Sequence, residues 1–211
     1  MVRSAKDKWD SYLWVPGGTV LRNRLDIYDF DELARVEHLL VTGRTDQLQR
    51  GDVLVQRTFD LGHQRTIHRH LFGDVYDWAG ELRTVELYKD SPVPFATPSD
   101  IPRVTDTAAQ IIGSTPWGEL GKDDFAERMS NVFAWVNYAH PFREGNGRTA
   151  KVFIMHVAEL SRYRLRFDVI EPDRWNIASM YTLPDRESAA PIPTLMIPVF
   201  ADMSELRDND F

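Results

Sequence analysis

The sequence predicts an all-α protein that carries one small β-hairpin, and three observations support this prediction. Apolar residues recur at helical spacing in several segments. One short segment, Thr84–Lys89, instead alternates apolar and polar residues, as a half-buried strand does. The chain has 211 residues, of which 43% are hydrophobic and 27% charged, and it has no cysteine. We therefore expect one well-buried core without disulfides or cysteine metal sites.

The first part of the chain predicts an arm followed by a helix. Residues 1–29 combine glycine and proline turn formers with aromatic residues, so we expect an N-terminal arm packed on the core. Either Asp29 or Asp31 can cap the helix that follows. The polar residues 43–58 predict no single element.

A second helix is predicted from Phe59 or Asp60, and it contains three histidines. His63, His68 and His70 raise the question of a metal site. Helix positions two apart do not share a face, and no cysteine or cluster of carboxylates lies nearby. We therefore favour a partly solvated helix face over a metal site.

The alternating segment is followed by a proline-rich tip and then by Phe95 and Ala96. This order predicts a short hairpin, which we call the flap (residues 84–96). An isolated hairpin is marginally stable, so the flap would lie on the helical body. An irregular loop is the alternative that the pattern leaves open.

The remaining sequence predicts further helices and a flexible C-terminal tail. They are expected to begin near Asp100, at Asp123 or Asp124 (ending before Pro141) and near Arg148, and to cover residues 172–182 and 185–202. Residues 30–202 would then form one domain, and the acidic residues 203–211 a flexible tail.

Charge and hydropathy exclude several classes of protein. The net charge is −7, which disfavours direct binding to nucleic acid or to an anionic membrane surface. The N-terminus lacks the apolar core of a secretory signal, and the longest apolar run is far shorter than a membrane span. A cytoplasmic location without membrane attachment is the expectation.

The chemistry concentrates in His140–Lys151, at the turn between two predicted helices. His140 can accept a proton near neutral pH. Gly145–Gly147 can turn successive backbone N–H groups into one concavity in front of a helix N-terminus, where an anion is stabilised. Three cations surround these glycines, namely Arg143, Arg148 and Lys151. The pattern favours a phosphate-bearing ligand.

The single acid of this stretch, Glu144, would repel a phosphate unless a cation bridged them. Mg²⁺ takes one or two carboxylates together with substrate phosphates, so the residues predict a Mg²⁺-nucleotide site beside a base. The Gly-Lys-Ser/Thr of a P-loop is missing. The alternative is a plain helix–helix turn in which His140 is a core histidine.

These residues resemble the signature of the Fic family, His-x-Phe-x-Asp/Glu-Gly-Asn-Gly-Arg-x-x-Arg. The matching positions are His140, Phe142, Glu144, Gly145, Asn146, Gly147 and Arg148, with Lys151 in place of the last arginine. Residues 75–85 resemble the lead-in to the family's flap, Phe95 and Ala96 its exit, and residues 19–29 the N-terminal segment of bacterial members. The resemblance implies a Fic-type helical bundle with a flap over the active site.

The resemblance also implies an activity, the transfer of AMP from Mg-ATP to a hydroxyl side chain of a target protein. It assigns His140 as the general base and Glu144 as the metal ligand. The remaining assignments are Gly145, Asn146 and Gly147 to an anion hole, Arg148 to the β- or γ-phosphate, and Phe142 to the core. Lys151 would hold phosphate more weakly than arginine, because it offers a point charge in place of a fork.

Two further surfaces follow from the resemblance. The flap would dock the target by strand addition along Thr84, Val85, Glu86, Leu87 and Tyr88. Trp175 and Tyr181, after the signature, are the candidates for the adenine pocket.

The regulation expected in this family points away from the chain itself. Its inhibitory motif is Ser/Thr-x-x-x-Glu-Gly/Asn, and here only Glu144 precedes a glycine or asparagine, with His140 four residues earlier. We therefore expect a separate antitoxin, this chain as the toxin, and type II topoisomerase subunits as targets. A host-directed effector, a Fic-type enzyme that transfers phosphate, UMP or phosphocholine, and a non-catalytic binding module remain as alternatives.

Overall fold

The structure is a computed structural model, and it describes residues 4–88, 93–185 and 190–207. Within these ranges the elements follow in this order: α1 (Ala5–Asp10), α2 (Phe30–Arg50), α3 (Leu61–Phe72), α4 (Ile101–Ser114), η1 (Trp117–Glu119), α5 (Lys122–Ala139), α6 (Asn146–Ala158), β1 (Tyr163–Leu165), η2 (Phe167–Val169), α7 (Pro172–Met180), η3 (Thr194–Met196), α8 (Ile197–Met203) and β2 (Ser204–Leu206). The predicted all-α fold class is confirmed.

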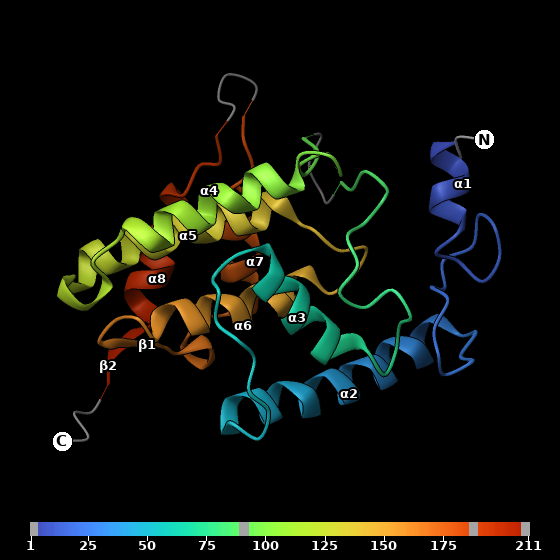
Figure 1. Cartoon of the computed structure of the whole chain (residues 1–211), viewed down its shortest axis with the longest axis horizontal. Coiled ribbons are helices and arrows are strands. Elements are labelled where there is room, and N and C mark those ends of the chain that lie inside the picture. Colours follow the sequence, from blue (N-terminus) through green and yellow to red (C-terminus); the bar gives the residue numbers. More distant parts are fainter. Residues whose placement is uncertain (1–3, 89–92, 186–189, 208–211) are drawn as a thin grey trace.

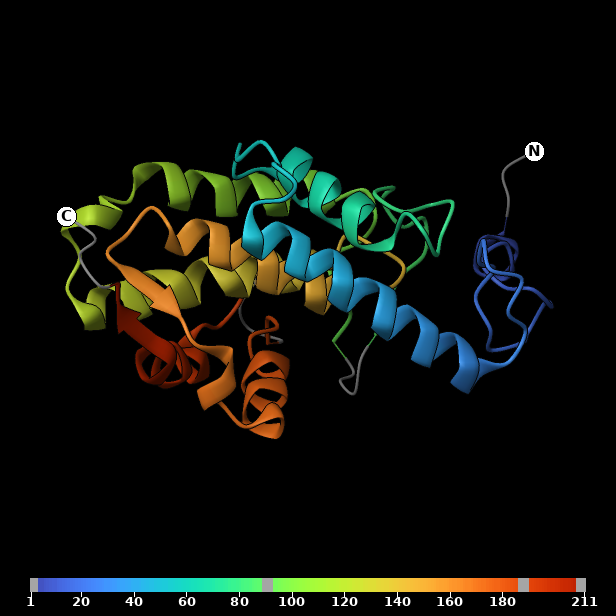
Figure 2. The same cartoon turned by 90° about the horizontal axis from the view of Figure 1, so that it is seen from below.

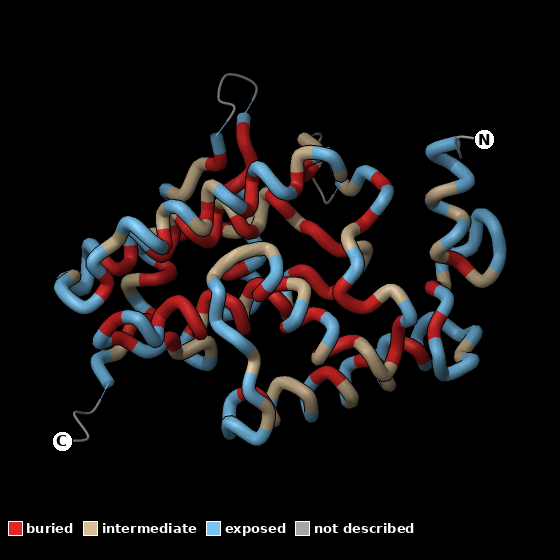
Figure 3. The backbone as a smooth tube through the Cα atoms, in the orientation of Figure 1, coloured by how far each residue is buried: buried red, intermediate tan, exposed pale blue. Residues whose placement is uncertain are grey.

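Helix α5 is the centre of the bundle (Figures 1 and 2). It packs against α4, α6 and α8, while α3 packs on α6 and α2 on α3. The buried residues follow the inner sides of these helices (Figure 3), and Phe125, Met129 and Phe153 are among those with little or no exposure. The N-terminal α1 and the β1–β2 pair lie at opposite ends of the molecule.

Helix α2 is longer than the sequence pattern indicated. It begins at the cap Asp29, whose Oδ1 accepts a hydrogen bond from the Glu32 amide at 2.9 Å, and ends at Gly51 with φ of 74°. The expectation of no element over residues 43–58 is thus wrong for residues 43–50. The helix continues because Val41 and Leu48, seven residues apart, both enter the core.

The end of the chain also differs from expectation. β1 and β2 pair antiparallel, with Arg164 opposite Glu205, and the Arg164 Nε donates to the Glu205 Oε2 at 2.7 Å. The prediction of a loose tail from Met203 is wrong as far as residue 206, because Met203 is fully buried and anchors the strand after it. Of the helix predicted over residues 185–202, the structure shows the turn η3 and helix α8, while residues 186–189 and 208–211 lie outside the described residues.

The flap is extended, with alternating burial. Val85 is buried, as is Arg83 just before the flap, whereas Thr84, Glu86 and Tyr88 are exposed. The Phe95 amide donates to the Leu87 carbonyl at 3.1 Å, which joins the two legs of the flap. Among the described residues of the flap none belongs to a regular strand. Of the predicted tip, Asp90, Ser91 and Pro92 lie outside the described residues, and Pro94 has no regular secondary structure.

The N-terminal arm contacts the body at several points. Leu13 and Leu21 are buried, and the Arg24 amide donates to the Val75 carbonyl at 2.8 Å. The Tyr12 ring meets the Trp78 ring edge to face, with centroids 5.8 Å apart. Within the described ranges, no helix combines the length and the apolar character that a membrane span requires.

The three histidines of α3 have separate partners, so they do not form one metal site among the described residues. The Nε2 of His63 lies 2.9 Å from the Nδ1 of His156, and that of His68 lies 3.0 Å from the Glu144 carbonyl oxygen. The Nε2 of His70 lies 3.1 Å from the carbonyl oxygen of Arg44. His63 and His68 are buried, which corrects the expectation of a solvated face.

The His63–His156 pair predicts a loss of stability in acid. Burial lowers the pKa of both histidines to about 4, whereas an unfolded chain titrates near 6.5. Between these values the unfolded state binds more protons, so the free energy of unfolding should fall as the pH drops below about 6.5, by on the order of 1 kcal/mol per histidine. Urea denaturation at pH 7 and pH 5 measures this loss.

A double variant provides the control for this prediction. His63→Leu with His156→Leu should reduce the pH dependence, while His38→Gln, on the exposed side of α2, should leave it unchanged. His68, which burial also shifts to a pKa of about 4, accounts for the part that remains. The same pH dependence in the double variant as in the wild type would contradict the assignment.

Candidate active site

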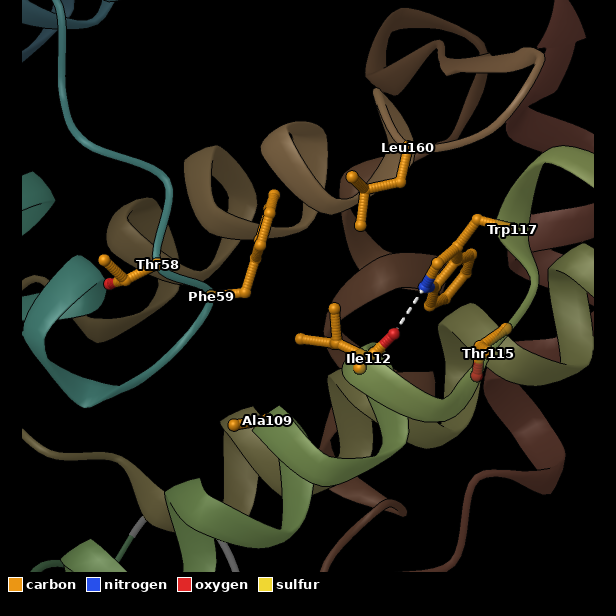
Figure 4. A pocket seen from close by; sticks show the side chains of 8 residues that line it. Thr58, Phe59, Ala109, Ile112, Thr115, Trp117 and Leu160 are labelled. Carbon is orange, nitrogen blue, oxygen red and sulfur yellow. Dashed lines mark hydrogen bonds between the residues drawn. The ribbon is translucent and has the colours of Figure 1, made fainter.

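The candidate active site is a cavity of about 690 Å³. It lies between the turn from His140 to Gly147, which we call the signature turn, α7, the flap and α1. It is lined by Trp9, Leu87, Tyr88, Phe95, Phe133, Asn137, His140, Arg143, Glu144, Asn146, Gly147, Ala150, Trp175, Asn176, Ile177, Ser179, Met180 and Leu183. Chain segments that are far apart in the sequence therefore meet here. A second hollow, of about 430 Å³ beside α4, has a mostly apolar lining that includes Phe59 and Trp117 (Figure 4) and none of the signature residues.

His140 is fixed by the end of α5. The helix stops because His140 adopts a left-handed backbone, with φ of 40°, and Pro141 follows. Its ring stacks on the ring of Phe95 with centroids 3.6 Å apart. The base is thus half-buried and held against the returning leg of the flap.

The turn after His140 is closed by Asn146. Its Oδ1 accepts a hydrogen bond from the Phe142 amide, and its Nδ2 donates to the Phe142 carbonyl, both at 2.8 Å. Phe142 is fully buried and stacks on His68 with centroids 3.9 Å apart. The side chain of Asn146 thus shapes the turn, which leaves its backbone N–H at the start of α6.

Glycine at position 145 is required by both conformation and space. Its φ is 80°, and an added Cβ would lie closer than 3.0 Å to three carbons of the Phe72 ring. Helix α6 begins directly after it without a side-chain cap, and Gly147 in its first turn lines the cavity. The backbone N–H groups of this turn can therefore bind an anion, which the helix dipole also stabilises.

Glu144 presents a carboxylate to this cavity. Its Oε1 accepts from the Gly145 amide at 3.0 Å, and its backbone carbonyl oxygen lies 3.0 Å from the His68 Nε2. The Gly80 amide donates to the Nδ1 of His68 at 2.8 Å, so Nε2 carries the proton and donates to Glu144. An exposed carboxylate beside an anion-binding helix N-terminus fits Mg²⁺, which shares its oxygen ligands between protein and phosphate.

Of the three predicted cations, Arg143 lines the cavity, whereas Arg148 and Lys151 have other partners in this structure and do not line it. The Arg148 Nη2 lies 2.6 Å from the Oε1 of Glu37, a buried residue of α2, and 3.5 Å from the Oε1 of Glu144. The Lys151 ammonium lies over the rings of Phe167 and Trp175, at 5.3 and 5.2 Å from their centroids. Burial lowers the pKa of Lys151.

Of the two adenine-pocket candidates, Trp175 lines the cavity and Tyr181 does not. Trp175 is also a core residue, because its ring packs edge to face on Phe133 with centroids 5.0 Å apart. Tyr181 is 57% exposed just beyond α7. Among the predicted target-docking residues of the flap, Leu87 and Tyr88 line the cavity, whereas Thr84, Val85 and Glu86 do not.

The cavity wall built by α1 and most of that built by α7 were not predicted from the sequence. Trp9 comes from the arm, and the Arg143 guanidinium lies 4.3 Å from its ring centroid. Asn176, Ile177 and Met180 come from α7 at the spacing of one helix face. That spacing was the available signal for α7, whereas no signal in the sequence places Trp9 beside Arg143.

Comparison with known proteins identifies the class to which this fold and site belong. A sequence model of the Fic/DOC family matches residues 58–158. The probable protein adenylyltransferase Fic of Escherichia coli K12 is 32% identical over 171 residues, covering 81% of this chain and 82% of that protein. The probable protein adenylyltransferase y4lH of Sinorhizobium fredii is 37% identical over 166 residues, covering 77% and 83%. The chain belongs to the Fic/DOC family.

Other relatives are longer, and solved structures share the fold. Protein adenylyltransferase VbhT of Bartonella schoenbuchensis is 36% identical over 169 residues, which cover 78% of this chain but 34% of VbhT. The BepC protein of Bartonella tribocorum, solved with AMPPNP, aligns with a TM-score of 0.81 at 22% identity, covering 94% of this chain and 98% of that one. A Fic domain of Bartonella quintana with bound ADP gives 0.82 at 24%, covering 93% and 95%.

Proposed function

We propose that this chain is a protein adenylyltransferase, which transfers AMP from Mg-ATP to a hydroxyl side chain of a target protein. One observation carries the proposal: a half-buried histidine, an exposed carboxylate and the uncapped N-terminus of α6 line one cavity. The names of the relatives at 30% identity or more support it, since they are described as protein adenylyltransferases.

The residues of the cavity would divide the reaction between them. The target hydroxyl attacks the α-phosphorus of ATP, and His140 takes the hydroxyl proton. The bond from the α-phosphorus to the bridging oxygen breaks, so that pyrophosphate leaves and an AMP phosphodiester forms on the target. The backbone N–H groups at Gly147 and its neighbours would stabilise the charge that develops on the phosphate.

Glu144 is the residue that would hold Mg²⁺ against the phosphates. A bound Mg²⁺ would neutralise phosphate charge and orient the leaving group. The apolar rings of Phe133 and Trp175 would form a wall of the adenine pocket. The flap residues Leu87 and Tyr88 would contact the target protein. Arg148 would reach the terminal phosphates only after exchanging its contact with Glu37, and Lys151 only after leaving its two aromatic rings.

Labelled ATP tests the activity directly. Incubation of the protein with a cell lysate and Mg-ATP should leave an α-phosphate label on a target protein and no γ-phosphate label. A γ label would indicate phosphate transfer. Label from UTP or from a phosphocholine donor would indicate another cargo. A complete absence of label, with ATP still bound, would favour a non-catalytic binding module.

We further propose that a separate antitoxin restrains this chain, and that type II topoisomerase subunits are among its targets in the cytoplasm. The antitoxin is proposed because the inhibitory motif is missing, since no glutamate other than Glu144 precedes glycine or asparagine. The topoisomerase targets are proposed from the family resemblance alone. Co-expression with the neighbouring gene, followed by purification through one tag, should recover a complex with reduced AMP transfer. Recovery of an active, toxic chain without a partner would contradict the antitoxin and favour a host-directed effector.

A further inference from the structure

Arg83 is a buried cation whose hydrogen bonds go to backbone carbonyls. It is 2% exposed, although it lies in an otherwise alternating, half-exposed segment. Its Nε donates to the carbonyl oxygen of His140 at 2.7 Å, and its Nη1 to that of Val85 at 2.6 Å. Its Nη2 donates to the carbonyl of Ala96 and, at 3.4 Å, to that of Ala139.

These four carbonyl acceptors lie on two separate parts of the fold, the end of α5 and the flap. Ala139 and His140 are the C-terminal end of α5, where carbonyl groups lack helical partners and the dipole is negative. Val85 and Ala96 lie on the two opposite legs of the flap. A guanidinium offers five N–H donors in one plane, so a single side chain can hold both structures.

Two backbone hydrogen bonds and one ring contact reinforce this junction. The Arg83 amide donates to the Pro141 carbonyl at 2.9 Å, and the Ala96 amide to the Tyr138 carbonyl at 3.0 Å. Between them, the Phe95 ring stacks on the His140 imidazole. The base is thus fixed on its backbone side by Arg83 and on its ring side by the flap residue that Arg83 helps to hold.

The burial of an arginine without a carboxylate in hydrogen-bond contact needs a reason. No carboxylate of the described residues accepts a hydrogen bond from Arg83, and desolvation of a charge is costly unless its donors are satisfied. Burial lowers the pKa of Arg83 to about 10, so it remains charged at neutral pH. An apolar side chain at this position would avoid the desolvation cost of the charge. The role of the cation is therefore to fix the position of the flap relative to the end of α5.

We propose that Arg83 is a positioning residue that fixes the His140 base and both legs of the flap in one geometry. Within the proposed function, on which this inference rests, Arg83 would place the target hydroxyl, held by the flap, within reach of the base. It would not touch ATP, because it lies outside the residues that line the cavity. Lysine cannot replace it, since one ammonium cannot span carbonyls on both sides of the junction.

The test compares Arg83→Lys and Arg83→Met with a matched control, Arg44→Lys. Arg44 forms a two-point ion pair with Asp74, through Nε at 2.8 Å and Nη2, and lies outside the cavity lining. For Arg83→Lys we expect the Kd for ATP to stay within about twofold, while kcat falls roughly ten- to a hundredfold and the KM for the target rises. Arg44→Lys should keep wild-type kcat and KM values. Melting temperatures set an assay temperature at which all variants are folded.

Amide hydrogen exchange gives a readout that does not depend on AMP transfer. In Arg83→Lys the Phe95 and Ala96 amides should exchange faster, because the legs of the flap lose their common anchor, while amides within α2 keep their rates. If folded Arg83→Lys and Arg83→Met keep both kcat and these exchange rates, the proposal is overturned. Equal losses of ATP affinity and kcat would also overturn it, since they indicate general destabilisation. If the wild-type chain transfers no AMP, the proposed function fails, and the exchange rates still decide the role of Arg83.

Discussion

Replacement of His140 by alanine is expected to lower the rate of AMP transfer by at least a factor of about 100, with little change in ATP affinity. The imidazole lines the cavity and is stacked on Phe95, so its removal takes away the group placed to accept the hydroxyl proton. The backbone of the turn should persist, because Arg83 binds the carbonyl of residue 140 and not the ring. Transfer of α-phosphate label to target protein measures the rate, and isothermal titration measures the affinity for Mg-ATP.

The exposed His38 of α2 provides the matched control. His38→Ala should transfer AMP at the wild-type rate, because it lies on the outer side of α2 and does not line the cavity. A growth assay extends the comparison, since loss of toxicity in His140→Ala alone supports catalysis by the base. Wild-type labelling by folded His140→Ala would remove the imidazole from the mechanism.

A second large effect is expected from Gly145→Ala, this time on stability and activity together. Alanine at φ of 80° would be strained, because a left-handed backbone is unfavourable for a residue with a Cβ. That Cβ would also overlap the fully buried Phe72 ring. The two terms together should lower the free energy of unfolding by roughly 2–4 kcal/mol. Because residue 145 precedes the first turn of α6, any relief of the overlap shifts the anion-binding N–H groups. Urea denaturation and ATP titration measure the two losses.

Gly43→Ala is the control for this substitution. Gly43 lies within α2, and a Cβ there meets nothing within 4 Å. Alanine should therefore stabilise the protein by about 0.5–1 kcal/mol, as expected in a helix interior, with no effect on ATP binding. Equal stability of Gly145→Ala and the wild type would contradict this prediction, because it would show that the turn moves away from the Phe72 ring without strain.

The helices were predictable where burial follows a regular period. The end of α5 before Pro141 was predictable for a different reason, because proline constrains the residue before it whatever the tertiary context. The prediction was wrong where packing overrides local composition. Residues 43–50 look polar, yet they continue α2, and Ser204–Leu206 looks like a loose tail, yet it pairs with β1. In both places a few buried side chains, such as Leu48 and Met203, decide the outcome.

The sequence by itself determined the turn from His140 to Gly147 and its chemistry, because a base, an acid and glycines within eight residues are adjacent whatever the rest of the fold does. Only the tertiary structure decided what surrounds that turn. It brings Trp9 to Arg143, Glu37 to Arg148 and Arg83 to His140, in each case across more than fifty residues. Such pairings follow from the packing of helices on one another, which fixes distances that no local pattern encodes.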